Sequence, residues 1–161
     1  MAKAVQPRIF ILLDELAAFE AVEGPTAVSA GRPSNDEDQD LHTWVGTIIG
    51  PSVIVGGRNQ SNFCDRIYSL KLHCSDKYPY EPPTIHFINK INLPGVDPTD
   101  GRVDPSKFNL LKEWIATGNP QQHLKFSISS ALYELRTYMQ RNYQLPQEEE
   151  NAVYDCYKDN R

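Results

Sequence analysis

The chain has 161 residues and a mass of 18.3 kDa, the size of one ordinary domain. Its 40% hydrophobic and 23% charged residues exclude wholesale disorder, and no apolar run approaches the roughly 18 residues that a membrane-spanning helix needs. The net charge of −5 argues against nucleic acid as the main partner, and three cysteines are too few for a disulfide framework, which favours a reducing compartment.

The first predicted element is a helix that ends at Gly24-Pro25, and no apolar block precedes Pro7, so a secretory signal is not expected. The apolar stripe of this helix recurs with the 3.6-residue period and consists of Ile9, Leu12, Leu13, Leu16 and Phe19. Phe10 lies off the stripe and groups with Asp14, and Ile11 lies off it too. We therefore expect Phe10 to be available for a contact outside the core.

Four short strands are predicted next, over residues 27–31, 44–49, 66–74 and 84–89. In the third, Tyr68, Leu70, Leu72 and Cys74 alternate with polar residues, which places them on the core face. An acidic loop at 34–40 is expected to be solvated, and residues 52–62 are expected to form a long loop. Because all connections are short, the four strands should form an antiparallel meander.

The chain is predicted to be irregular over residues 93–105, because its prolines remove ladder donors. A short helix is expected within residues 108–114, and Asn119-Pro120 should open a long helix with Gln122 completing its cap. The buried stripe of that helix consists of Leu124, Ile128, Ala131, Leu132, Leu135 and Met139. The predicted fold is α+β, with helices on one face of the sheet and the other face partly open. The domain covers residues 1–146, and 147–161 form a polar, loosely held tail.

No motif indicates a metal or nucleotide cofactor, since the sequence has no CxxC, HExxH, GxGxxG or P-loop. The four histidines, His42, His73, His86 and His123, lack metal-ligand spacing. No cysteine is predicted to act as a nucleophile: Cys74 belongs to the core, Cys64 lies beside Asp65, and Cys156 falls in the tail.

The most distinctive motif is Tyr78-Pro79-Tyr80-Glu81-Pro82-Pro83, between two strands. By itself it predicts a rigid turn, but at this place it resembles the ubiquitin-conjugating enzyme fold. Trp44-Val45-Gly46-Thr47-Ile48-Ile49-Gly50-Pro51 is similar to the W-x-G-T-I-x-G-P strand of that family. The segments Pro7-Arg8-Ile9-Phe10, Arg66-Ile67-Tyr68-Ser69-Leu70 and Lys90-Ile91-Asn92-Leu93-Pro94 resemble its catalytically inactive branch, the ubiquitin-conjugating enzyme variants. The resemblance covers residues 7–146.

Active members of the family carry His-Pro-Asn, whose Asn supports an oxyanion, and then G-x-[IV]-Cys, whose Cys forms the ubiquitin thioester. Here Leu93-Pro94-Gly95 stands in place of His-Pro-Asn, and Asp104 follows Gly101-Arg102-Val103 where the Cys belongs. A carboxylate cannot hold a thioester, and glycine has no side chain to donate a hydrogen bond. The resemblance therefore implies an inactive homologue, which also lacks the last two helices of active members.

The resemblance further implies a cofactor subunit that forms a heterodimer with an active lysine-63-specific ubiquitin-conjugating enzyme. Phe10 and Asp14 would contact that enzyme, and ubiquitin ligases would be reached through it. An acceptor ubiquitin would be held non-covalently on the outer sheet face by Ser29, Thr47 and Ile67. Such a subunit needs no cofactor, nucleic acid or membrane, and is expected in the cytoplasm and nucleus, in DNA damage tolerance or signalling.

Two alternatives stay open at this point. One is an active conjugating enzyme that uses an unexpected cysteine. The other is a sorting module, whose relatives precede coiled coils that this chain lacks. The sequence also departs from the variants in its longer 52–65 segment, in Gly95 where some relatives have Cys, and in Ile11 at a position that is often basic.

Overall fold

The computed structural model describes residues 7–24, 26–34, 39–118 and 125–157. Three α-helices occur in this part: α1 Arg8–Glu20, α2 Asn109–Thr117 and α3 Ile128–Arg141. The main sheet has the order β1-β2-β5-β6 and consists of β1 Val28–Gly31, β2 Thr43–Ile49, β5 Ile67–His73 and β6 Thr84–Phe87. A separate hairpin is made of β3 Ile54–Val55 and β4 Arg58–Asn59, and two short 3-10 helices are η1 Pro105–Lys107 and η2 Asp155–Tyr157.

All pairings in the main sheet are antiparallel between chain neighbours, so the predicted meander is confirmed. The inner face is closely packed because its residues alternate with outward ones. The side chains of Trp44, Ile48, Tyr68, Leu70, Leu72 and Phe87 are all buried there. Gly46 completes this face, since a Cβ on it would lie 2.9 Å from the Leu72 side chain and 3.4 Å from that of Leu132.

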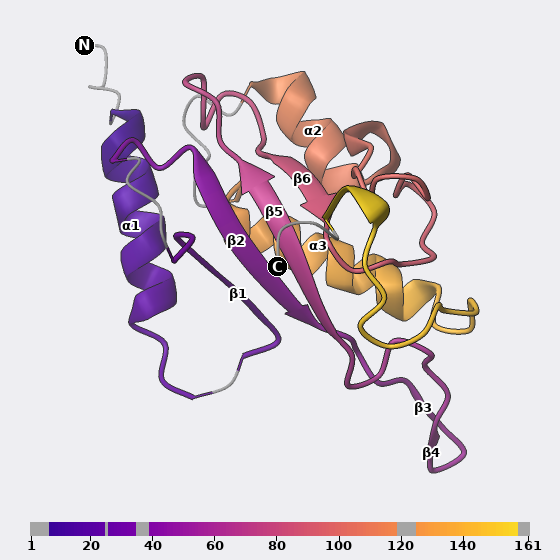
Figure 1. Cartoon of the computed structure of the whole chain (residues 1–161). Helices are drawn as coiled ribbons and strands as arrows, with labels where there is room; N and C mark the ends of the chain where they lie inside the picture. The colour runs from indigo at the N-terminus through magenta and orange to yellow at the C-terminus, as the bar shows by residue number, and fades with distance from the viewer. Residues whose placement is uncertain (1–6, 25, 35–38, 119–124, 158–161) are drawn as a thin grey trace.

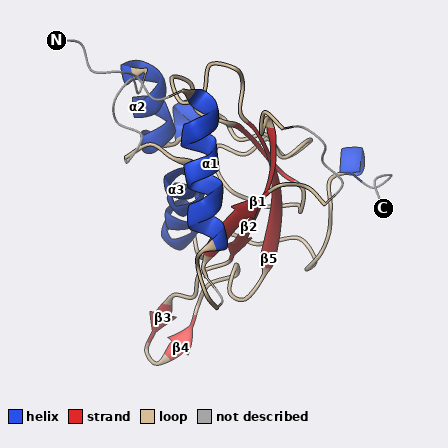
Figure 2. Ribbon diagram, turned by 90° about the vertical axis from the view of Figure 1, so that its left-hand side faces the viewer, coloured by secondary structure: helices blue, strands red, loops and turns tan. Residues whose placement is uncertain are grey.

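The helices α1 and α3 cover one face of the sheet and leave the other open, as Figures 1 and 2 show. The predicted α+β layering is therefore confirmed. No helix in the described ranges has the length and apolar character required to cross a membrane.

Four of the five residues of the predicted stripe of α1 face the core: Leu12 is buried, and Ile9, Leu16 and Phe19 pack against the core. Ile11 is buried, whereas Leu13 is 45% exposed. The Arg8 guanidinium donates hydrogen bonds to the carbonyls of Cys74 at 2.9 Å and Ser75 at 2.8 Å. These bonds join the start of α1 to the residues that follow β5, and the helix edges then differ from the prediction at Ile11, which is buried, and Leu13, which is exposed.

The expected long loop at 52–62 contains the β3–β4 hairpin, which corrects the prediction. Gly56 and Gly57 have φ values of +62° and +79°, the backbone conformation of a two-residue hairpin turn. Figure 2 shows this hairpin leaving the molecule toward the side of the helices.

The long helix starts later than predicted, at Ile128, and the expected cap residues Asn119 and Gln122 lie outside the described residues, as does Leu124. Its N-cap is Ser127, whose hydroxyl accepts the Ser130 amide at 3.1 Å while the Ser130 hydroxyl accepts the Ser127 amide at 2.8 Å. From Ile128 to Met139 the predicted buried stripe is confirmed. The short helix α2 extends beyond its prediction to Thr117, and β6 stops two residues early.

The described part of the C-terminal segment is packed against the domain, which corrects the prediction of a loosely held tail. Tyr154 is 2% exposed, its amide donates to the Ile88 carbonyl at 3.1 Å, and the Lys90 amide donates to the Ala152 carbonyl at 2.8 Å. Gly101 makes room for the ring, because a Cβ on it would lie 2.6 Å from Tyr154 Cε2. The tail thus continues the hydrogen bonding of the sheet beyond β6.

Candidate functional site

Exposed apolar side chains mark the first turns of α1. Phe10 is 55% exposed, as predicted, and Leu13 beside it is 45% exposed, although the apolar stripe predicts it on the buried face. Asp14 follows on the same helix and is also exposed. Sequence reasoning missed Leu13, because the helix has more apolar residues than one buried face can hold.

Glu15 fixes α1 to two other parts of the chain. One carboxylate oxygen accepts the Ile128 amide at 2.7 Å, at the start of α3, and the other accepts the Tyr78 hydroxyl. Burial raises the pKa of Glu15 to about 7, against the opposing effect of these hydrogen bonds. Glu15 lies four residues after Ile11 and three after Leu12, and this helical spacing places it on the same face as these two buried residues.

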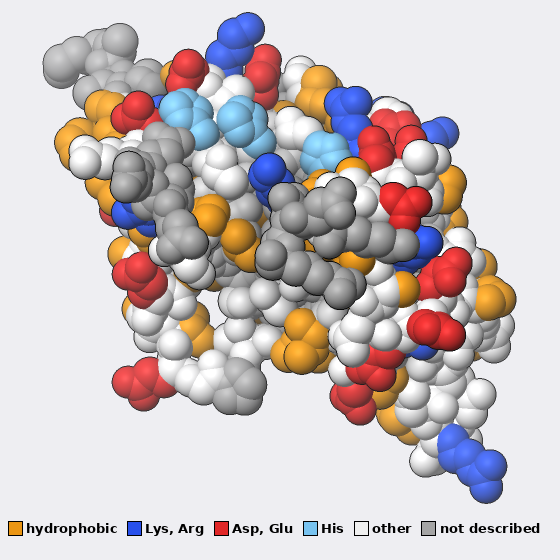
Figure 3. Space-filling view, in the orientation of Figure 1, with side chains coloured by type: hydrophobic (Ala, Val, Ile, Leu, Met, Phe, Trp, Pro, Cys, Tyr) orange, Lys and Arg blue, Asp and Glu red, His pale blue; other side chains and the backbone are white. Residues whose placement is uncertain are grey.

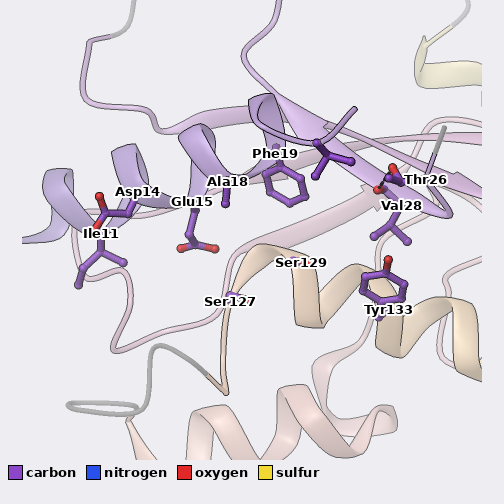
Figure 4. A pocket seen from close by; sticks show the side chains of 11 residues that line it. Ile11, Asp14, Glu15, Ala18, Phe19, Thr26, Val28, Ser127, Ser129 and Tyr133 are labelled. Carbon is purple, nitrogen blue, oxygen red and sulfur yellow. Dashed lines mark hydrogen bonds between the residues drawn. The ribbon is translucent and has the colours of Figure 1, made fainter. Parts of the chain in front are cut away.

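A groove of about 480 Å³ runs between α1 and α3 next to this carboxylate (Figure 4). Its lining is largely apolar and includes Ile11, Ala18, Phe19, Val28 and Tyr133. The turn at Tyr78-Pro79 closes one end of the helix layer, because Trp114 Nε1 donates to the Pro79 carbonyl at 2.7 Å. These hydrogen bonds hold α1 in place, so its exposed face has a fixed position on the molecule.

The outer sheet face carries a row of three hydroxyl residues in register. Ser29 lies opposite Thr47, and Thr47 lies opposite Ser69. The next row toward one end pairs Ile49 with Ile67, which is 59% exposed. The structure thus brings the three predicted acceptor residues, Ser29, Thr47 and Ile67, onto one open face.

The loop from Leu93 to Asp104 forms a second region. Leu93 is buried, Pro94 is exposed, and the Asp104 amide donates to the Gly95 carbonyl at 2.7 Å. Gly95 has φ +93°, and a Cβ on it would lie 2.7 Å from Phe108 Cε2. Position 95 therefore does not accept a side chain without a shift of its neighbours.

Asp104 is exposed and caps η1. Its carboxylate accepts the Ser106 hydroxyl at 2.7 Å and the Ser106 amide at 3.0 Å, and these bonds lower the pKa of Asp104. A neighbouring hollow of about 490 Å³ is lined by Gly95, Val96, Asp97, Arg102, Asp104, Pro105 and Lys107, with no cysteine among them. The loop therefore presents beside this hollow a carboxylate that is held in place by Ser106.

The three cysteines lie elsewhere in the chain. Cys74 is fully buried, and burial together with nearby Glu15 raises its pKa. The pKa of Cys64 is raised by burial and by Asp65. Cys156 is exposed within η2. Raised pKa values in two of these thiols oppose formation of the thiolate that cysteine catalysis requires.

Comparison with known proteins gives one consistent family. The family described as ubiquitin-conjugating enzyme matches residues 13–153. The chain is similar to the ubiquitin-conjugating enzyme spm2 of Schizosaccharomyces pombe, with 37% identity over 96% of this chain and 99% of the relative. It is also similar to the ubiquitin-conjugating enzyme variant MMS2 of Saccharomyces cerevisiae, with 44% identity over 67% of this chain and 72% of that protein.

Solved structures resemble the fold. An E2 domain of a Toxoplasma gondii ubiquitin conjugating enzyme aligns with a TM-score of 0.57 and 27% identity, over 80% of this chain and 71% of that one. Human ubiquitin-conjugating enzyme E2 G1 aligns with a TM-score of 0.59 and 24% identity, over 84% of this chain and 98% of the human chain.

Proposed function

The chain belongs to the ubiquitin-conjugating enzyme family, on its variant branch, and from this membership we propose that it is a non-catalytic subunit for ubiquitin chain synthesis. It forms a heterodimer with an active lysine-63-specific ubiquitin-conjugating enzyme. It also holds an acceptor ubiquitin non-covalently, so that lysine 63 of that ubiquitin faces the thioester on the partner. It acts in the cytoplasm and nucleus, in DNA damage tolerance or signalling, and meets ubiquitin ligases through the partner.

The region around Asp104 supports a role without catalysis. Gly95 supplies no side-chain donor for an oxyanion, and Asp104 is held by Ser106 as a helix cap. No thioester forms on a carboxylate. The Leu93-Pro94-Gly95 segment and Asp104 are in this proposal the remnant of an active site.

The first turns of α1 support a contact with the partner enzyme. A large aromatic side chain that is 55% exposed is a common anchor of protein interfaces. Phe10 has Asp14 one turn along on α1, and Glu15 fixes the helix beneath them. We assign Phe10 and Asp14 to the heterodimer contact.

The observation that carries the proposal is the open outer sheet face, where Ser29 and Thr47 are cross-strand partners and Ile67 is exposed. We call these three residues the acceptor surface. A small patch with one apolar residue and two hydroxyls suits weak, reversible docking of a protein. Holding one lysine near a thioester raises its effective concentration, and good orientation contributes up to roughly 7–11 kcal/mol to such reactions.

The proposal is tested by reconstituted chain synthesis with activating enzyme, ATP, an active lysine-63-specific conjugating enzyme and ubiquitin, with and without this chain. We expect free chains only when this chain is present, and none when the ubiquitin lacks lysine 63. Equal chain formation in its absence, or chains that persist without lysine 63, would contradict the proposed function.

A further inference from the structure

One row of basic side chains crosses the outer sheet face next to the acceptor surface. Strand pairing places Lys71 opposite His86, and His86 lies opposite Arg102 across an isolated bridge. Lys71 and Arg102 are exposed, and His86 is partly buried. We call these three residues the cationic row. Because neighbouring strands lie about 4.8 Å apart, its side chains project side by side from the same face.

The charges of this row are not paired by salt bridges within the described ranges, where none joins Lys71 or Arg102 to a carboxylate. The pKa of His86 is lowered by burial, and Arg102 and Lys71 add to this effect while Asp100 opposes it. Asp100 itself accepts the Arg102 backbone amide at 2.9 Å, so it is held at the edge of the row.

The cationic row is continuous with the acceptor surface. Lys71 lies two residues beyond Ser69 on β5, and Ser69 is opposite Thr47. Residues two apart on a strand share a face and lie about 7 Å apart. Figure 3 shows histidines gathered on the upper part of this face. Even a weak, transient interface covers up to roughly 600 Å² on each partner, so a ubiquitin seated on the acceptor surface extends beyond its three residues.

We propose that the cationic row is the charged part of the acceptor surface and pairs with carboxylates of the acceptor ubiquitin. This inference rests on the proposed function. Charges at the edge of an interface contribute more to orientation and association rate than to affinity. In this site orientation decides which lysine reaches the thioester, and the row fixes how the bound ubiquitin is turned about the hydroxyl patch.

The experiment is a titration of isotope-labelled ubiquitin with the full chain, followed by NMR at low and at high salt. The variants are Lys71→Glu and Arg102→Glu. The matched control is Arg58→Glu, which makes the same change in charge on the exposed β3–β4 hairpin, away from this face. Thermal melting of each variant checks the fold, and Lys71→Gln provides a milder change at the same position.

Each reversal should raise Kd about three- to tenfold at low salt, because an exposed ion pair contributes up to about 1 kcal/mol and a reversal adds repulsion. The affinity of the wild-type chain should fall with added salt, and the variants should lose most of that dependence. Arg58→Glu should behave as wild type. If Lys71→Glu, Lys71→Gln and Arg102→Glu all bind with wild-type affinity and salt dependence, the inference is wrong.

Thr47→Glu in the same titration separates this inference from the proposed function. If Thr47→Glu abolishes binding while the reversals leave it unchanged, the acceptor surface stands and the cationic row is not part of it. If Thr47→Glu binds as wild type, the acceptor surface is misassigned and both proposals fall. If Lys71→Glu instead loses affinity for a labelled single-stranded oligonucleotide and keeps its affinity for ubiquitin, the row belongs to nucleic acid and the inference is overturned.

Discussion

Gly95 and Asp104 meet across one backbone hydrogen bond, and together they decide what this loop can do. The variant Asp104→Cys introduces a thiol, but Gly95 still has no side chain to donate a hydrogen bond to an oxyanion. A larger residue does not fit at position 95, because its Cβ would lie 2.7 Å from the Phe108 ring. We therefore expect no ubiquitin thioester on the variant. The measurement is incubation with activating enzyme, ATP and ubiquitin, followed by a search for an adduct that a thiol reductant removes. Such an adduct would contradict this assignment of the loop.

Glu15 makes the stability of the fold depend on pH. Its pKa is about 7 in the folded chain and 4.5 in its ordinary state, so the protonated carboxyl favours the folded form. This contribution is present below pH 4.5 and is lost as the pH rises through 7. We expect the free energy of unfolding to fall by up to about 3 kcal/mol over this window.

The matched variant is Glu15→Gln, which keeps the shape of the side chain and removes its titration. Urea unfolding at about pH 5 and about pH 7.5 should show a smaller change for the variant than for wild type. The same pH dependence in both chains would mean that another group is responsible.

Among the elements, α1 is the one whose exposed face is proposed to bind the partner enzyme. Phe10→Ala should weaken the heterodimer by about 2–4 kcal/mol, the range of aromatic hot spots. Because Phe10 is 55% exposed, the melting temperature should hardly change. Calorimetry with the purified partner enzyme measures the affinity. Glu20→Ala, exposed at the other end of α1, serves as the control. Unchanged affinity of Phe10→Ala would place the contact elsewhere.

The packed C-terminal segment behaves as part of the domain. Tyr154 is 2% exposed against Gly101, so Tyr154→Ala should lower the free energy of unfolding by about 3 kcal/mol or more. Cys156→Ala, at an exposed position two residues on, should change it by less than about 0.5 kcal/mol. Denaturant unfolding measures both variants. Equal stabilities would mean that the segment is not held in solution.

The elements that the sequence predicts well are those with one clear period. The alternation in β5 and the stripe from Ile128 to Met139 both appear as predicted, because each has one buried face and one polar face. The stripe of α1 is ambiguous at its edges, since apolar residues cover more than half of its surface, and there Ile11 is buried and Leu13 is exposed. The packing of Tyr154 depends on a glycine 53 positions away, which no local pattern reveals.

At the scale of the whole molecule, the candidate contacts lie on two separate surfaces. Figures 1 and 2 show α1 in the layer on one side of the sheet, and the residues of the acceptor surface alternate with buried ones, so they face the other side. Sequence alternation alone predicts which residues of β2 and β5 point outward. The cationic row could not be found in this way, because the alignment of Lys71 with His86 and Arg102 depends on register and on a bridge outside the strands.

This separation predicts that chain synthesis can be lost while the heterodimer is kept. Ser29→Arg and Thr47→Glu each place a bulky charge on the acceptor surface, where desolvation without a partner is costly. Ile67→Ala removes at most about 1.5–3 kcal/mol of apolar burial from the docked ubiquitin. Since the Ile67 side chain is 59% exposed in the free chain, Ile67→Ala should change the free energy of unfolding little.

These three variants should abolish chain synthesis from free ubiquitin and keep the affinity for the partner enzyme, whereas Phe10→Ala should lose both. Chain synthesis is followed by electrophoresis with an active lysine-63-specific enzyme, and the heterodimer is measured by calorimetry on the same preparations. The reason is geometric: the sheet lies between α1 and the acceptor surface, so a charge on one face leaves the other unchanged. If Thr47→Glu supports normal chain synthesis, the acceptor ubiquitin is not held on this face and orientation by the sheet is not the mechanism.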